Sequence, residues 1–350
     1  MSLFNWSRPL RALGHGSYSV VVTDGQYAAK VFQDGNEDSL LNEVHAYLQT
    51  NVLLDMKICP FFLRFYGIGP ILDQVQRDVL KGSFEDVKNL SISGNCLILE
   101  KGERSLEDVI SILTEEEAWS IFVQLIIAVS VMRDHFYHND LYSQNILLTS
   151  VDQETLTFKT HSGVLSIPTY GYLIKICDYG IADFYGGPSS SGMEVVEDLL
   201  RKRLSDQEDQ NPRGTKIEDL RPTNDGPDAK RFISAWSYVN SVKEDFCHYH
   251  ILKDNNCEIA DVITVMYAFR SRRPGMSRVN QLISDVVRDL DRLEGDARDD
   301  FCIKDYLEKI LETHPLLEEN RVLTELEAEY DLTTDHMCFL NDVEMEDLYA

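Results

Sequence analysis

Short apolar runs separated by glycine-containing turns predict a β-rich region in the first hundred residues. The run Leu13–Val21 carries two glycines between apolar ends, and Asp24–Gly25 is typical of a two-residue hairpin turn. The segment Tyr27–Phe32 follows as the returning strand, and Asn95–Gly102 predicts a strand that runs into a connector. The pattern therefore indicates a small sheet built around a hairpin.

Two stretches show the period of a helix. The first covers about Asp38–Thr50, where leucines and a valine recur on one face. The second starts at the capping box Thr114–Glu117 and runs from Trp119 to about His135 with apolar residues on most sides. We expect the first helix to turn one face to the core and the second to be buried on nearly all sides.

Strand-like patterns return further along the chain. Ile146–Leu148 predicts a strand, and Thr155–Phe158 with Gly163–Pro168 alternates like a small hairpin. Leu173–Cys177 is an apolar strand that re-enters the core, and the chain then reads as mainly helical to about Tyr330. We predict an α+β fold of two lobes and a tail. The first lobe, at 1–103, is small and β-rich with one helix. The second, at 104–342, is larger and mainly helical, with a hairpin insertion at 149–172 and a polar segment at 186–227, and an acidic tail follows at 343–350.

Composition limits the partners. The chain has 350 residues, 33 basic and 59 acidic, for a net charge of -26. This acidic charge makes direct binding to nucleic acid or to an anionic membrane unexpected. It favours a basic protein partner, and the alternative is that the charge serves only to keep the protein soluble. An odd count of 7 cysteines, without a C-x-x-C pair, predicts reduced thiols in a cytoplasmic or nuclear compartment. No run reaches the length of a membrane span, and Met1–Leu10 lacks the features of a secretory signal.

Two polar runs that follow apolar segments carry the residue types needed for phosphoryl transfer. His138–Asn145 reads His-Asn-Asp-Leu-Tyr-Ser-Gln-Asn and places an Asp and an Asn five positions apart, and Asp178–Gly180 reads Asp-Tyr-Gly. This chemistry needs a carboxylate near the attacking hydroxyl and side-chain oxygens that hold magnesium on the phosphates. Loop capping is the alternative for Asp140 and Asn145, because both residue types favour turns.

Three features of the first lobe fit the same chemistry. Leu13–Val21 contains a G-x-G-x-x-S pattern whose glycines let backbone approach phosphate, although an ordinary hairpin would also suit it. Lys30 lies between apolar neighbours on its strand, and Glu43 lies beside the apolar stripe of the following helix. We expect these two to pair; the alternatives are an exposed strand lysine and a surface glutamate, with Glu37 as a competing partner.

Along the chain, the glycine-rich loop comes first, followed by Lys30, Glu43, His138–Asn145 and Asp178–Gly180. Five motifs in this order resemble the eukaryotic-type protein kinases from Leu13 to about Asp183. The hairpin-like insertion and Asp-Tyr in place of Asp-Phe resemble the haspin branch, and kinases of large DNA viruses share similar features. The resemblance implies a bilobal kinase-like fold, ATP and Mg²⁺ as cofactors and a protein substrate. A viral source would place the protein in a host cell or virion. The sequence does not predict an oligomeric state.

The resemblance also implies a role for each matching residue. Asp140 would orient the attacking hydroxyl and accept its proton, and Asn145 and Asp178 would hold magnesium. Lys30, positioned by Glu43, would hold the α- and β-phosphates. The residues expected around the nucleotide are Gly14, His15, Gly16, Ser17, Tyr18 and Ser19 over the phosphates, Val21 over the purine, Ala28, the connector Glu100 to Gly102 at the adenine, Leu99 guarding the pocket, and Leu147 under the base.

Departures from the kinase pattern leave other functions open. Asn139 replaces the Arg that would meet an activation-loop phosphate, and Tyr142 stands where Ser/Thr kinases usually place a Lys. No Ala-Pro-Glu follows Asp178, and Asp228 is expected either to brace the catalytic loop or to cap a helix. The first hypothesis is a serine/threonine-protein kinase. The alternatives are a small-molecule kinase of the aminoglycoside or choline type and a pseudokinase scaffold, although the Lys, the Asp and the magnesium Asp are all present.

Overall fold

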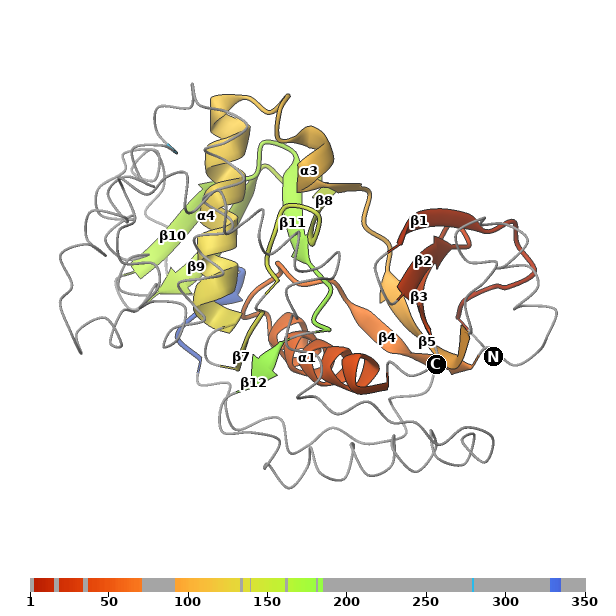
Figure 1. Ribbon diagram of the computed structural model, residues 1–350. Coiled ribbons are helices and arrows are strands. Elements are labelled where there is room, and N and C mark those ends of the chain that lie inside the picture. Colours follow the sequence, from red (N-terminus) through yellow and green to blue (C-terminus); the bar gives the residue numbers. More distant parts are fainter. Residues whose placement is uncertain are drawn as a thin grey trace, which may run out of the picture.

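The computed structural model describes residues 3–15, 19–33, 37–70, 92–132, 135–138, 140–160, 163–180, 182–184, 279 and 328–334. Figure 1 shows a five-stranded sheet at one end, and a long helix with a hairpin at the other. The described part is α+β and rich in sheet, as expected. Most of the predicted helical lobe, including the polar segment 186–227, Asp228 and the acidic tail, lies outside the described residues.

The five-stranded sheet is antiparallel throughout and follows the order β1-β2-β3-β5-β4. Its strands are β1 (Arg11–His15), β2 (Ser19–Thr23), β3 (Tyr27–Gln33), β4 (Phe65–Pro70) and β5 (Ile92–Glu100).

The turn between β2 and β3 is one residue longer than expected. Residues Asp24, Gly25 and Gln26 separate the two strands, so the predicted two-residue turn is wrong. The Asp24 carboxylate accepts the N–H groups of Gln26 and Tyr27, each at 2.9 Å. Gly25 has a φ of +101°, a backbone conformation that favours glycine. Capping by the aspartate side chain stabilises the longer connection.

The central strand β3 separates two apolar clusters. Ala29 and Val31 pack on one face in a cluster with Phe4, while Ala28 and Phe32 join the main core on the other face. Because side chains alternate along a strand, the face that carries Ala28 and Phe32 also carries residue 30. Strand β3 therefore contributes side chains to both clusters, and Lys30 faces the larger one.

Helix α1 (Glu37–Asp55) packs below this sheet and is longer than the predicted Asp38–Thr50. Leu53 is fully buried and Leu54 packs against the core, so the apolar face continues past the expected end. The helix stops where Lys57 takes a φ of +54° and donates its N–H to the Leu54 carbonyl.

Helix α4 (Glu115–Met132) is surrounded by protein, as its sequence predicts. The capping box is present, because Thr114 N–H donates to the Glu117 carboxylate and Glu117 N–H donates to the Thr114 hydroxyl. The Gln124 side chain donates to the Tyr172 carbonyl and accepts from Ile174 N–H, both at 3.0 Å. No helix within the described ranges is long and apolar enough to cross a bilayer.

The strands that follow carry the candidate chemistry. They are β6 (Arg104–Ser105), β7 (Phe136–Tyr137), β8 (Ile146–Ser150), β11 (Tyr172–Ile176) and β12 (Asp183–Phe184), with the short helix α3 (Leu106–Val109) after β6. Strand β8 pairs with both β6 and β11. The linker after α1 bonds to β11, since Ile176 N–H donates to the Phe61 carbonyl and Leu63 N–H donates to the Ile176 carbonyl. This linker joins the first lobe to the strand that ends beside residue 178.

The insertion forms the predicted hairpin, β9 (Thr155–Thr160) with β10 (Gly163–Pro168). A third strand, β13 (Tyr330–Asp331), pairs with β9 in parallel. This strand begins at about the residue where the predicted helical region ends. The Tyr330 ring stacks on Phe158 with centroids 5.1 Å apart, so a distant segment gains both backbone and ring contacts.

A matched pair of isoleucines tests where the core lies. Ile127 on α4 is completely buried, whereas Ile112 is 70% exposed. Ile127→Ala should lower the free energy of unfolding by about 2–5 kcal/mol, because it leaves a cavity in close-packed surroundings. Ile112→Ala should change it by less than about 0.5 kcal/mol. Urea unfolding measures both, and equal losses would contradict the buried position of α4.

Candidate functional site

A buried lysine brings three distant segments together. Lys30 on β3 forms an ion pair with Glu43 on α1, and its ammonium lies 2.6 Å from Asp178 Oδ1. The side chains of Lys30 and Glu43 are 6% and 1% exposed, whereas that of Asp178 is 43% exposed. The predicted Lys30–Glu43 pair is therefore present, and the third partner comes from 148 residues further along the chain.

Local packing fixes the position of Glu43. Tyr47 lies one helical turn after it on α1 and packs edge-on against Tyr179, with ring centroids 4.9 Å apart. Gly180 follows directly, and a Cβ there would lie 2.6 Å from the Ser39 hydroxyl on the same helix. A side chain at position 180 would displace the Ser39 hydroxyl and contact the Glu43 carboxylate, so the glycine permits the close approach of this turn to α1.

The backbone turns sharply at Asp178. Its φ is +69°, a left-handed conformation that costs a non-glycine residue about 1 kcal/mol or more. The next residue, Tyr179, is fully buried and donates its hydroxyl to the Ile176 carbonyl at 3.0 Å. Its ring also packs against Phe136 and His138. Burial of the tyrosine holds the strained turn and leaves the Asp178 carboxylate at the edge of the core.

The loop between β7 and β8 is bonded to the same turn. His138 Nε2 lies 3.0 Å from the Cys177 carbonyl, and Cys177 N–H donates to the Asn145 carbonyl at 3.0 Å. The Asn145 side-chain amide donates to the Asp140 carbonyl at 2.9 Å and to Asp140 Oδ2 at 3.2 Å. These bonds place Asp140, Asn145 and Asp178 in one neighbourhood, as the sequence predicts.

The charges around Lys30 are unequal. Burial raises the pKa of Glu43 to about 8, against the opposing attraction of the Lys30 ammonium. Burial also disfavours charge on Asp178, but the Lys30 ammonium outweighs it and lowers the pKa of that carboxyl. The pKa of Lys30 is raised, because the two carboxylates outweigh its desolvation. Asp178 thus carries its negative charge more readily than Glu43 does.

Several of the nucleotide-binding candidates lie on the same sheet as Lys30. Val21 on β2 lies opposite both Lys30 and Gly14 in the sheet, and Ala28 lies opposite Leu99. His15 ends β1 and Ser19 starts β2, while Gly16, Ser17 and Tyr18 lie outside the described residues.

The connector after β5 approaches β8 closely. A Cβ on Gly102 would lie 2.5 Å from Leu147 Cδ1, so only glycine fits against that side chain. Glu100 gives its N–H to the Arg64 carbonyl at 2.8 Å. Within the part of the chain that the structure describes, Gly102 N–H has no protein acceptor. The connector thus has a backbone donor next to Leu147, the two groups expected at the adenine.

Asn145 and Asp178 offer oxygen atoms to a cation. The Asn145 amide nitrogen is bonded to Asp140, which leaves its Oδ1 as the remaining polar atom. The half-exposed Asp178 supplies an anionic carboxylate. Among the described residues no three His, Cys, Asp or Glu side chains gather into a metal site. One carboxylate and one amide oxygen, completed by phosphates and water, match the way proteins hold Mg²⁺. These residues fit the ion.

The sequence did not reveal that Glu107 also holds the loop. Its N–H donates to the Ser143 carbonyl at 3.1 Å, and its carboxylate accepts the Ser143 hydroxyl. Glu107 lies on α3, which Ser105 caps in a reciprocal pair with Asp108. The Ser-x-x-Asp spacing could have located the start of this helix. Which loop the helix contacts depends on the tertiary fold.

The comparisons with known proteins agree with the resemblance. No protein-family model matches the chain. A serine/threonine-protein kinase haspin homolog from Arabidopsis thaliana is 26% identical over 204 residues, covering 53% of this chain and 34% of that protein. The chain therefore spans about a third of the length of this curated relative. The similarity supports a divergent relationship to the eukaryotic-type protein kinases.

His138 should make stability depend on pH. Burial lowers the pKa of His138 from 6.5 to about 4, so the folded protein keeps this ring neutral. Between pH 4 and pH 6.5 the unfolded chain binds a proton at this ring that the folded chain does not. The contribution of the neutral ring to the free energy of unfolding is therefore complete above about pH 6.5 and decreases as the pH drops toward 4. Lowering the pH from 7.5 to 5 should reduce the free energy of unfolding by about 2 kcal/mol through this ring.

The substitution His138→Gln isolates this contribution. The amide of glutamine can still donate to the Cys177 carbonyl but does not titrate. Urea unfolding at pH 7.5 and pH 5 should show a smaller acid loss in the variant than in the original protein. Equal losses would mean that His138 is not kept neutral by the fold.

Proposed function

We propose that this chain transfers the γ-phosphoryl group of ATP to a hydroxyl group of a protein, with serine or threonine as the acceptor. The observation that carries the proposal is the Lys30 ammonium between Glu43 and Asp178, next to the loop of Asp140 and Asn145. The Lys30 ammonium can bind phosphates, and Asp178 and Asn145 can supply oxygens to a metal. Asp140 adds an exposed carboxylate beside them. The name of the Arabidopsis relative favours serine or threonine over other acceptors.

Asp140 is assigned to the acceptor hydroxyl. Its N–H donates to His138 Nδ1 at 3.3 Å, and its carbonyl accepts from the Asn145 amide and from Tyr142 N–H. The hydroxyl oxygen forms a bond to the γ-phosphorus while the bond to the bridging oxygen breaks and ADP leaves with that electron pair. The hydroxyl proton goes to the Asp140 carboxylate. The fixed loop lowers the entropic cost of aligning these groups.

Lys30 is assigned to the α- and β-phosphates, and Asn145 and Asp178 to magnesium. When bound, the ion neutralises charge that develops on the phosphate oxygens. The turn between β1 and β2 would cover the phosphates, and Gly102 would bond the adenine beside Leu147. Glu43 would not touch the nucleotide, because it is buried behind Lys30, and is a positioning residue.

The acceptor is proposed to be a protein with a basic surface. A net charge of -26 produces a negative field that attracts basic partners and repels acidic ones. Tyr142 occupies the position where a lysine would contact the γ-phosphate in the resembled kinases. The assigned centre therefore relies on Lys30 and the metal for cationic stabilisation. Because the lysine that would contact the γ-phosphate is absent, transfer to small alcohols is the alternative function that the experiment must exclude.

A labelled-ATP assay tests the function directly. The purified chain with Mg²⁺ should label histones and basic peptides more than casein, choline or an aminoglycoside, and acid hydrolysis should release phosphoserine or phosphothreonine. Asp140→Asn should reduce transfer by about 100-fold or more while nucleotide binding persists, because the proton acceptor is lost. Asp152→Asn, an exposed aspartate in the turn before β9, should leave the rate unchanged.

The possible results separate the candidate functions. Labelling of a small alcohol without labelling of proteins would establish the small-molecule kinase. Nucleotide binding without transfer to any acceptor would favour a scaffold. Full activity of Asp140→Asn would contradict the role assigned to this carboxylate.

Lys30→Met should separate phosphate binding from folding. Without the ammonium the phosphates lose their fixed cation, so kcat/KM for ATP should fall by about 100-fold or more. Lys159→Met removes a lysine whose ion pair with Asp331 spans 3.5 Å on the hairpin sheet, and its kinetics should be unchanged. Steady-state kinetics measure both, with circular dichroism to confirm folding. Equal kinetics for the two variants would make Lys30 a bystander.

A further inference from the structure

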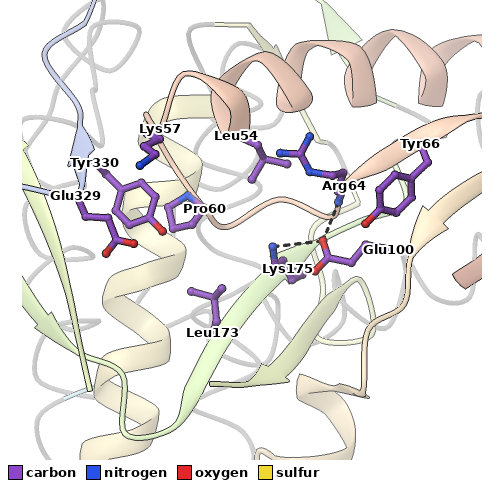
Figure 2. Close-up of a pocket in the computed structure, with 10 residues that line it drawn as sticks. All are labelled: Leu54, Lys57, Pro60, Arg64, Tyr66, Glu100, Leu173, Lys175, Glu329 and Tyr330. Atoms are coloured by element: carbon purple, nitrogen blue, oxygen red, sulfur yellow. Dashed lines mark hydrogen bonds and ion pairs between the residues drawn. The ribbon is translucent and has the colours of Figure 1, made fainter. Parts of the chain in front are cut away.

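A cavity lies apart from the proposed phosphate site. Its volume is about 330 Å³, and Figure 2 shows the residues around it. The walls come from five places in the chain: the end of α1 and its linker (Leu54, Lys57, Pro60), the entry to β4 (Arg64, Tyr66), the end of β5 (Glu100), β11 (Leu173, Lys175) and β13 with its preceding residue (Glu329, Tyr330). Of the residues assigned to the nucleotide, only Glu100 lines it, through its side chain.

The most informative group in this cavity is Lys175. Its side chain is 10% exposed, and its ammonium lies 3.3 Å from Glu100 Oε2. The same oxygen also accepts the Arg64 N–H at 3.0 Å. An ammonium has three N–H donors, and Glu100 is its acceptor among the residues that the structure describes. Because Lys175 is nearly buried and lines the cavity, its remaining N–H donors favour a ligand with an oxygen acceptor there.

The remaining walls suit a small planar molecule. Figure 2 shows Tyr330 and Pro60 on one side of the cavity, Lys175 and Glu100 on the other, and Leu173 below. The volume is at the lower end of the range for small-molecule sites. The lining combines five apolar or aromatic residues with five charged ones. Lys57, Arg64 and Lys175 against Glu100 and Glu329 give the lining a net charge of +1, in a strongly acidic chain.

The cavity is built before any ligand arrives. Asp331 N–H donates to the Lys57 carbonyl at 3.0 Å, which joins β13 to the linker after α1. The stack of Tyr330 on Phe158 fixes the ring that forms one wall. Lys175 lies on a strand that pairs with β8 along its whole length. Walls held in this way would lose little conformational entropy on binding.

We propose that this cavity binds a small organic anion. Its carboxylate or phosphate would accept hydrogen bonds from Lys175, and its flat apolar part would lie between Tyr330, Pro60 and Leu173. The ligand would occupy a site separate from that of ATP, beside the contact that joins the connector to β11. Binding here does not depend on phosphoryl transfer.

The test uses phenyl phosphate and benzoate as probes. Each is titrated against the full chain by ligand-observed NMR, with a non-hydrolysable ATP analogue and Mg²⁺ in excess so that the phosphate site is filled. At least one probe should bind, and the pair tells a phosphate from a carboxylate ligand. Lys175→Met should weaken binding by about tenfold or more, because a charge-assisted hydrogen bond is lost. Lys30→Met, which removes the other lysine that is buried among the described residues, should not weaken it.

A second variant guards against loss of folding. Leu173→Trp fills the cavity from below without removing the Lys175–Glu100 ion pair, and it should abolish binding while circular dichroism stays unchanged. Failure of both probes to bind would overturn the proposal. Binding that survives Lys175→Met and Leu173→Trp would place the probe elsewhere and overturn it as well. Neither result would bear on the proposed kinase activity, which is measured separately.

Discussion

The structure depends on one ammonium group buried between two carboxylates. An unpaired charge at the position of Lys30 would carry a desolvation penalty of several kcal/mol. Glu43 and Asp178 offset it, and each comes from a different element. The first sheet, α1 and the turn after β11 must therefore meet for the lysine to be buried at all. This requirement couples the packing of the core to the assembly of the candidate site.

The second constraint is the backbone around Cys177. Its N–H and carbonyl bond to Asn145 and His138, while the next residue supplies the carboxylate beside Lys30. Main-chain bonds at position 177, which any residue except proline could make, thus bring the two runs of polar residues together. The neutral His138 ring contributes because it accepts from Asp140 N–H while its other nitrogen faces the Cys177 carbonyl. The chemistry of the site rests on this shared scaffold.

Local patterns were sufficient for much of the fold. The strand at Tyr27–Phe32, the helical period around Glu43, the capping box at Thr114 and the hairpin of the insertion were each predicted from neighbouring residues in the sequence, and each is present. The turn at Asp24 and the end of α1 were misjudged, because side-chain capping and burial of Leu53 extend these elements. Element boundaries respond to contacts that periodicity does not contain.

The sequence by itself determined which residue types are available: a lysine in an apolar strand, a glutamate on a helix and Asp and Asn five positions apart in a loop. The tertiary structure alone decided that Asp178 shares the lysine, that Glu107 holds the loop between β7 and β8, that Tyr330 returns to pair beside the insertion, and that Lys175 lines a separate cavity. The physical reason is distance along the chain. Contacts between residues separated by tens to hundreds of positions leave no local pattern, because they arise only when burial of the whole core brings the segments together.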